Sequence, residues 1–280
     1  MAARALRATD VLALLGAFTG PAPEPPPAGR FARPEVPEDL APALAALAPA
    51  VRARVLDPLG RRGPQPAPGL PRTLTLPAAD GVSAPARQVD ERTCGAAVLA
   101  LLALAGDPRR ALELSRRPPA AETFAGLQRR LHARATRGPG GLPAWPVALG
   151  TPPWGAARVA RYGPVRYTHR VVGGRSGTRV LAAAAEAAAA GVPVPLYSGG
   201  DLARGVSTAV PRHVVLLTAV RDGVATVYEP SSGRLHGLPV AGLVAAGGVG
   251  RPTGTDRTTE AALGGWPHVV WALLPRDTRG

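Results

Sequence analysis

The run from Cys94 to Ala105 is apolar on nearly every side of the helix that it predicts. A surface helix keeps a polar face toward water, so a helix without one has to be surrounded by protein. Gly106 follows the run, and glycine is the residue that most often ends a helix. The run therefore predicts a central helix around which a domain is built.

The composition indicates a folded protein. A chain of 280 residues with 46% apolar content is long enough to bury a sizeable core. The formal charge of +14 would suit a nucleic-acid partner, yet the sequence lacks Lys, Ile and Asn, while Ala, Arg, Gly and Pro are abundant. This bias is typical of a GC-rich genome, and no nucleic-acid-binding motif accompanies the arginines. We therefore expect no nucleic-acid partner.

Cys94 is the single cysteine, which excludes an intramolecular disulfide and a zinc site of Cys and His ligands. No apolar run approaches the about 18 to 20 residues of a membrane span. Arg4 and Arg7 precede an apolar run that weakly imitates a signal peptide. Thr9 and Asp10 interrupt this pattern where a helix N-cap would lie. We expect a cytoplasmic protein without metal or organic cofactor, and export stays open.

Two proline-rich stretches, Pro21–Pro27 and Arg62–Pro68, divide the chain, because proline interrupts helices and central strands. Between them the sequence predicts a helical piece that is broken or bent near Pro49. Residues 1–72 are therefore expected to form a helical and proline-rich N-terminal extension, and residues 73–280 to form the main domain.

Such an extension can lie over the domain as a lid or pack beside it, and we expect it to pack against the domain. Its first helix carries apolar side chains that would otherwise be exposed together. These side chains are Leu6, Val11, Leu14, Leu15 and Phe18.

The rest of the chain alternates helices with strands that become more frequent toward the end. Further helices are expected at 108–117, 122–137, 153–161 and 178–190, and strands at 165–171, 192–197, 213–220 with its return strand, and 269–274. The prolines of the strand at 192–197 favour an edge position. Helices around the cysteine followed by antiparallel strands predict an α+β fold, with the cysteine helix packed on the sheet.

Cys94 lies in the first turn of its helix, where the backbone dipole favours a thiolate. Gly95 leaves room for another segment to approach the sulfur. Six residues ahead, the amide of Gln88 could stabilise an oxyanion together with the backbone N–H of Cys94. The alternative for an isolated cysteine is a small apolar side chain in a buried helix.

His213 begins a strand, and Glu229 ends the strand that returns beside it. If Arg221–Gly223 forms a three-residue hairpin loop, Leu217 faces Val227. His213 and Glu229 then share one face of the sheet, within reach of each other. A two-residue turn would shift the register and place them on opposite faces.

The other histidines fit the role of a base less well. His132 is expected on a solvated helix face, and His169 in an exposed strand. His236 follows a turn, and the acid that follows His268 is Asp277, beyond the end of its strand. By elimination, His213 is therefore the histidine that best fits the role of the base.

Several short motifs occur in one order along the chain: Gln88, Cys94-Gly95, His213-Val214-Val215 and Glu229-Pro230. In this order they resemble the papain-like cysteine peptidases, and more narrowly their bacterial C39-like branch. The resemblance covers about residues 74–275. Glu229 stands where that branch usually has Asp, and the segment between the cysteine and the histidine is longer than usual.

The resemblance implies a papain-like fold and a thiol-dependent hydrolase that cleaves a peptide or other amide bond. Cys94 would be the nucleophile, His213 the base, Glu229 the orienting acid and Gln88 part of the oxyanion hole. It implies a peptide or protein substrate and no cofactor. The alternative is a non-catalytic papain-like domain that binds a peptide or protein partner in the same cleft.

Overall fold

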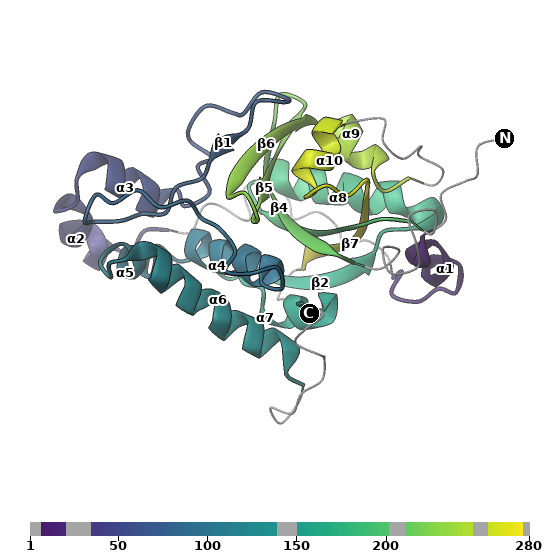
Figure 1. Cartoon of the computed structure of the whole chain (residues 1–280), viewed down its shortest axis with the longest axis horizontal. Coiled ribbons are helices and arrows are strands. Elements are labelled where there is room, and N and C mark those ends of the chain that lie inside the picture. The colour runs from purple at the N-terminus through teal and green to yellow at the C-terminus, as the bar shows by residue number, and fades with distance from the viewer. Residues whose placement is uncertain (1–6, 21–34, 139–149, 202–210, 249–256, 277–280) are drawn as a thin grey trace.

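The computed structural model describes residues 7–20, 35–138, 150–201, 211–248 and 257–276. At its centre lies a seven-stranded sheet of order β1-β6-β5-β4-β3-β7-β2, in which all neighbouring strands are antiparallel (Figure 1). The strands are β1 (Arg72–Thr73), β2 (Arg166–Val171), β3 (Val194–Gly199), β4 (His213–Arg221), β5 (Val224–Glu229), β6 (Arg234–Pro239) and β7 (His268–Arg276).

Helices cover both faces of this sheet. They are α1 (Ala8–Leu14), α2 (Ala41–Ala45), α3 (Pro49–Leu56), α4 (Cys94–Gly106), α5 (Pro108–Ser115), α6 (Ala120–Thr136), α7 (Pro153–Val159), α8 (Gly177–Ala189), α9 (Val240–Ala245) and α10 (Arg257–Ala262). Single turns of 3-10 helix span Glu38–Leu40 and Gly174–Ser176. The expected α+β fold is confirmed.

The side chains of β4 alternate between two hydrophobic cores. Val214 and Leu216 pack with α4, α6 and α7 on one face, whereas Val215 and Leu217 pack with α8, α9 and α10 on the other. Within α4, every residue except Ala103 is buried. The expectation of a central helix without a polar face is therefore confirmed.

The strand β3 is not the edge strand that its prolines favoured. It lies between β4 and β7 in the sheet. Pro195 faces Leu216 of β4, but the pairing of β3 with β7 begins only at Leu196. The proline therefore lies where β3 extends beyond its second neighbour, so its missing N–H costs no bond on that side.

The hairpin between β4 and β5 has a two-residue turn, so the expected three-residue loop is wrong. Arg221 pairs with Val224, and the turn consists of Asp222 and Gly223. Both residues have positive φ angles, 49° and 72°, which is the conformation of a type I′ turn.

A β-bulge at Thr218 compensates for the shorter turn. The register of β4 on β5 shifts there by one residue, so that Leu217 pairs with Val227 as expected. The parity lost at the turn is regained at the bulge. His213 and Glu229 consequently lie on the same face of the sheet.

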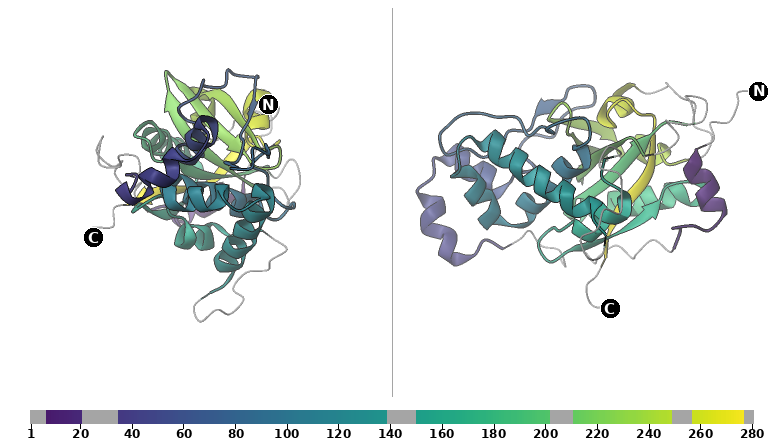
Figure 2. Two further views of the ribbon diagram at one scale, coloured as in Figure 1. Left: turned by 90° about the vertical axis from the view of Figure 1, so that its left-hand side faces the viewer. Right: turned by 60° about the horizontal axis from the view of Figure 1, so that its bottom comes forward.

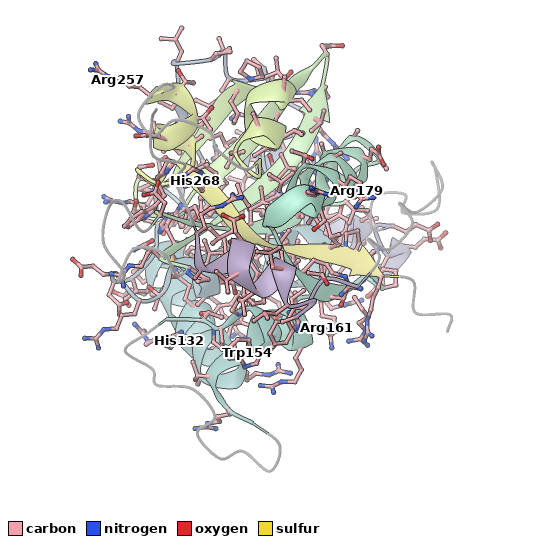
Figure 3. All side chains as sticks on the ribbon, turned by 90° about the vertical axis from the view of Figure 1, so that its right-hand side faces the viewer. His132, Trp154, Arg161, Arg179, Arg257 and His268 are labelled. Carbon is pink, nitrogen blue, oxygen red and sulfur yellow. The ribbon has the colours of Figure 1, made fainter. Side chains whose placement is uncertain are left out.

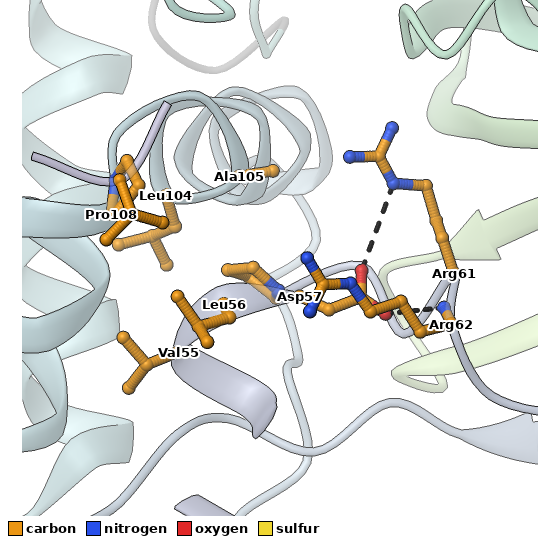
Figure 4. Close-up of a pocket in the computed structure, with 10 residues that line it drawn as sticks. Val55, Leu56, Asp57, Arg61, Arg62, Leu104, Ala105 and Pro108 are labelled. Atoms are coloured by element: carbon orange, nitrogen blue, oxygen red, sulfur yellow. Dashed lines mark hydrogen bonds and ion pairs between the residues drawn. The ribbon is translucent and has the colours of Figure 1, made fainter. Parts of the chain in front are cut away.

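The N-terminal extension contacts the domain at two opposite ends, with α1 at one and α2 with α3 at the other (Figures 1 and 2). The second part packs on α5 through a small hydrophobic core, which consists of Leu40, Leu44, Val51, Val55, Ala111 and Leu112. Beside it lies a cavity of about 30 Å³, room for about one water molecule (Figure 4). Asp57 lines this cavity and accepts the N–H of Arg62 at 2.6 Å.

The helix α1 packs against the domain as expected, but with the opposite face. Leu14 and Leu15 are 83% and 75% exposed, whereas Arg7, Thr9 and Asp10 are buried. Val11 and Phe18 are also exposed, and Leu6 lies outside the described residues. The reason is a buried ion pair between Arg7 and Asp10, whose oxygen and nitrogen atoms also bond to the domain backbone.

No helix in the described part of the chain combines the length and the apolar character needed to cross a membrane.

Leu44 and Leu70 test whether the extension belongs to the cooperatively folded core. Leu44 is 6% exposed and Leu70 is 72% exposed. We expect Leu44→Ala to lower the free energy of unfolding by about 2 to 4 kcal/mol. Leu70→Ala should change it by less than about 0.5 kcal/mol. Urea unfolding measures both, and equal effects would show that α2 and α3 do not stabilise the domain.

Candidate active site

A cavity of about 530 Å³ lies where the N-terminal end of α4 meets the beginning of β4. Cys94 and His213 both line this cavity. The remaining lining is largely apolar, and it includes Leu12, Phe18, Pro152, Pro153, Trp154, Tyr197, Pro211, Val214 and Trp271.

Cys94 is the first residue of α4 and is 5% exposed. The preceding turn is held by the hydroxyl of Thr93, which accepts the N–H groups of Val89 at 3.1 Å and of Asp90 at 3.0 Å. The carbonyl of Thr93 accepts the N–H of Ala97 at 2.8 Å and so begins the helix. The thiol therefore lies at the positive end of the helix dipole, beside the cavity.

The absence of a side chain at Gly95 brings another segment close to the thiol. A Cβ atom at this position would lie 2.8 Å from Cβ of Thr151 and 3.3 Å from Cγ2 of Val214. Thr151 is held in turn by Tyr197, whose hydroxyl donates to its carbonyl at 3.1 Å. Gly95 thus permits the close packing that forms the wall of the cavity beside Cys94.

His213 and Glu229 form the pair that the strand register predicted. Nε2 of His213 lies 2.8 Å from Oε1 of Glu229, and the two side chains are 11% and 4% exposed. Cys94 lines the same cavity and is close enough to the ring of His213 to influence its charge. Because the carboxylate occupies Nε2, Nδ1 is the ring nitrogen left to interact with the thiol. Neither Asp90 nor Asp222 takes the place of Glu229.

Burial alone would lower the pKa of His213. Hydrogen bonds and charge interactions with Cys94 and Glu229 outweigh burial and raise this pKa to about 9. The imidazole is therefore protonated near neutral pH.

The carboxylate of Glu229 is fixed by the turn that follows it. Oε1 accepts the N–H and the hydroxyl of Ser231 at 2.7 and 2.6 Å, and Oε2 accepts the N–H of Ser232 at 2.8 Å. Burial alone would raise the pKa of Glu229, but the hydrogen bonds from His213 and the serines hold this pKa well below its ordinary value. The two serines were not predicted as site residues, although their position directly after Glu229-Pro230 was the available signal.

Gln88 is close to this turn, and its amide is hydrogen-bonded within its own loop. Its backbone N–H donates to the carbonyl of Pro230 at 2.9 Å, and its side-chain amide donates to the carbonyl of Asp90 at 2.8 Å. Oε1 is buried and has no hydrogen-bond partner in the described part of the chain. Gln88 is not among the residues that line the cavity. Its role in an oxyanion hole stays a prediction.

His132 is buried, not solvated as expected. Its exposure is 8%, and Nδ1 lies 3.3 Å from the hydroxyl of Thr151. His132 follows Gln128 and Phe124 at intervals of four residues, and both of these are buried on α6. This helical spacing was the signal that would have placed it on the inner face. His132 thus supports the wall formed by Thr151.

Two of the remaining histidines, His268 and His169, also have structural partners. His268 is paired with Asp201, which precedes it in the chain, at 3.1 Å, and not with Asp277, which lies outside the described residues. Both members of this pair are buried. Nδ1 of His169 accepts the indole N–H of Trp271 at 3.3 Å. His236 lies in β6, where burial lowers its pKa.

Among the described residues, no group of three or more His, Cys, Asp or Glu side chains is arranged to hold a metal ion. No protein-family model, curated protein or solved structure matches this chain.

The His213–Glu229 pair should make stability depend on pH. A histidine pKa of about 9 in the folded state, against 6.5 ordinarily, means that the charged ring stabilises the folded protein fully below pH 6.5. This contribution is lost as the pH rises through about 9. We expect the difference in Tm between the native protein and Glu229→Gln to be largest near pH 6 and to shrink toward about pH 9.5. Calorimetry measures this difference in Tm. A difference that does not depend on pH would show that the charged ring of His213 does not stabilise the folded protein.

Gly95→Ala tests the close packing beside the thiol. The added methyl group would force Thr151 or Val214 to move, at a cost of about 1 to 3 kcal/mol in stability. In Gly126→Ala, within α6, the nearest atom to the new methyl is Nη1 of Arg130 at 3.5 Å, an ordinary contact. This control should gain helix propensity without a clash. If both variants gain stability equally, the packing at Gly95 is looser than the structure indicates.

Proposed function

We propose that this protein is a cysteine peptidase-like hydrolase with a papain-like fold of the C39-like branch, which cleaves a peptide or other amide bond. The observation that carries the proposal is the alignment of Cys94, His213 and Glu229 beside one cavity. A thiol at a helix N-terminus, paired with an imidazole that an acid orients, is the arrangement needed for nucleophilic attack on a carbonyl. The fold supports the proposal because the cysteine helix packs on an antiparallel sheet whose central strand begins with the histidine.

The reaction would begin with attack of the Cys94 sulfur on the carbonyl carbon. A carbon–sulfur bond forms, and the carbonyl oxygen becomes an oxyanion. The backbone N–H of Cys94 would stabilise this oxyanion, and Gln88 would contribute the amide hydrogen that is not donated to Asp90.

Protonated His213 would then give its Nδ1 proton to the leaving amine, and the amide C–N bond breaks. The neutral ring would next take a proton from water, whose oxygen attacks the thioester. The carbon–sulfur bond then breaks, which releases the acid and restores the thiolate beside the protonated ring. Glu229 would hold the ring through Nε2 and compensate its charge while it is protonated. The serines at 231 and 232 would keep the carboxylate aligned for this role.

A reactivity series on the proposed triad tests this function. Alkylation by iodoacetamide near pH 7 should be faster in the folded protein than in the denatured chain, and His213→Ala should slow it by roughly 10²-fold. Cys94→Ala should eliminate cleavage of a peptide library while preserving the fold.

Glu229→Gln should lower kcat about ten- to a hundredfold and affect KM less, because the charge acts mainly on the protonated ring. Asp222→Asn is the matched control, since it makes the same chemical change in the turn of the same hairpin, and asparagine tolerates positive φ. This variant should retain full activity. If the folded protein reacts with iodoacetamide no faster than the denatured chain, the domain is a non-catalytic binding module.

A further inference from the structure

Part of the N-terminal extension forms a wall of the cavity that contains Cys94 and His213. Ala8, Thr9 and Leu12 line the cavity from α1, and Phe18 lines it from the turn that follows. Figure 3 looks onto α1, which lies at this end of the molecule in front of the sheet. The sequence predicts that this extension packs against the domain, but it does not place these residues beside Cys94.

A buried ion pair fixes the beginning of this segment. Arg7 and Asp10 are 1% and 5% exposed, and Nη2 of Arg7 lies 2.8 Å from Oδ1 of Asp10. The same nitrogen donates to the carbonyl of Gly247 at 3.2 Å, and the N–H of Gly174 donates to Asp10 at 2.8 Å. A buried ion pair whose atoms also bond to the backbone imposes one orientation on the helix.

The end of the segment is fixed as well. The carbonyl of Phe18 accepts the N–H of Val171, at the end of the edge strand β2, at 3.2 Å. The ring of Phe18 packs against His169 and Trp271, with ring centroids 5.5 and 5.6 Å apart. Residues 7–20 are thus attached to the domain on both sides of the part that lines the cavity.

The wall offers a specific chemistry to a substrate. Leu12 and Phe18 share the cavity with Trp154 and Trp271, so its surface favours a large apolar group. Thr9 lines the cavity, and its hydroxyl is buried without a hydrogen-bond partner among the described residues. A change of the Thr9 rotamer that turns this hydroxyl into the cavity would let a bound backbone amide pair with it.

We infer that residues 7–20 form a substrate-selecting wall, which binds a peptide with a large apolar side chain next to the amide attacked by Cys94. Leu12 and Phe18 contact that side chain, and the hydroxyl of Thr9 pairs with the peptide backbone. This inference rests on the function proposed above and adds the substrate class.

Labelling of Cys94 by two peptide probes tests the inference. Acetyl-Phe-Phe-chloromethyl ketone and acetyl-Gly-Gly-chloromethyl ketone carry the same reactive group, so the ratio of their rate constants measures selection by the cavity. We expect the Phe probe to react about ten- to a hundredfold faster. Iodoacetamide, which needs no cavity wall, measures the reactivity of the thiol alone.

Leu12→Ala should lower this ratio about tenfold by removing the apolar contact, and Leu12→Trp should lower it by filling the space. Leu14→Ala and Leu14→Trp are the matched controls, because Leu14 belongs to the same helix but is 83% exposed and does not line the cavity. The controls should keep the native ratio. All four variants should react normally with iodoacetamide.

Thr9→Val provides an independent test, which remains informative if the Leu12 variants do not fold. Valine has nearly the shape of threonine without the hydroxyl, so the variant should be at least as stable as the native protein. It should nevertheless react more slowly with both peptide probes and at the native rate with iodoacetamide.

Two results would overturn the inference. The first is a ratio of the two probe rate constants near one in the native protein. The second is an equal ratio in the Leu12 and Leu14 variants together with labelling of Thr9→Val by both peptide probes at the native rate. Either result would show that residues 7–20 do not select the substrate. With normal iodoacetamide labelling, either result would leave the proposed function intact. Failure of the folded protein to react with any of the three reagents would overturn both.

Discussion

The helix α4 has no polar face, and the arrangement of the domain follows from the need to cover it. One side packs on the sheet, and α5, α6 and α7 cover much of the rest. When the sides of a helix are buried in this way, only its ends can face a cavity or solvent. Cys94 occupies one of these ends, so the constraint that fixes the core also brings the thiol to the edge of the central strand, beside His213.

The sequence indicated the central helix, the strands and the pairing of His213 with Glu229, because each depends on local pattern or on short-range register. The route to that pairing was not predictable. A two-residue turn at Asp222 and Gly223 would have separated the two side chains, and the bulge at Thr218 brings them back to one face. Bulges depend on how two strands pack in the whole sheet, and an isolated threonine carries no signal for one.

The predicted orientation of α1 was wrong for a related reason. Apolar periodicity identifies the buried face of a helix only when that face packs against apolar side chains. Here an arginine and an aspartate bond to each other and to glycine backbone atoms, and this contact between distant segments decides which face is buried. The position of His132 was recoverable from spacing, whereas that of residues 7–20 required the tertiary structure.

The cavity draws its walls from almost the full length of the chain. Ala8 and Thr9 come from its beginning, and Trp271 comes from β7, the last strand of the described residues. During synthesis, a ribosome makes α1 and the cysteine helix long before β7, which separates β3 from β2 in the sheet. A nascent chain therefore carries its thiol without a completed site until β7 has been made, and the walls that surround Cys94 assemble only when β7 has left the ribosome.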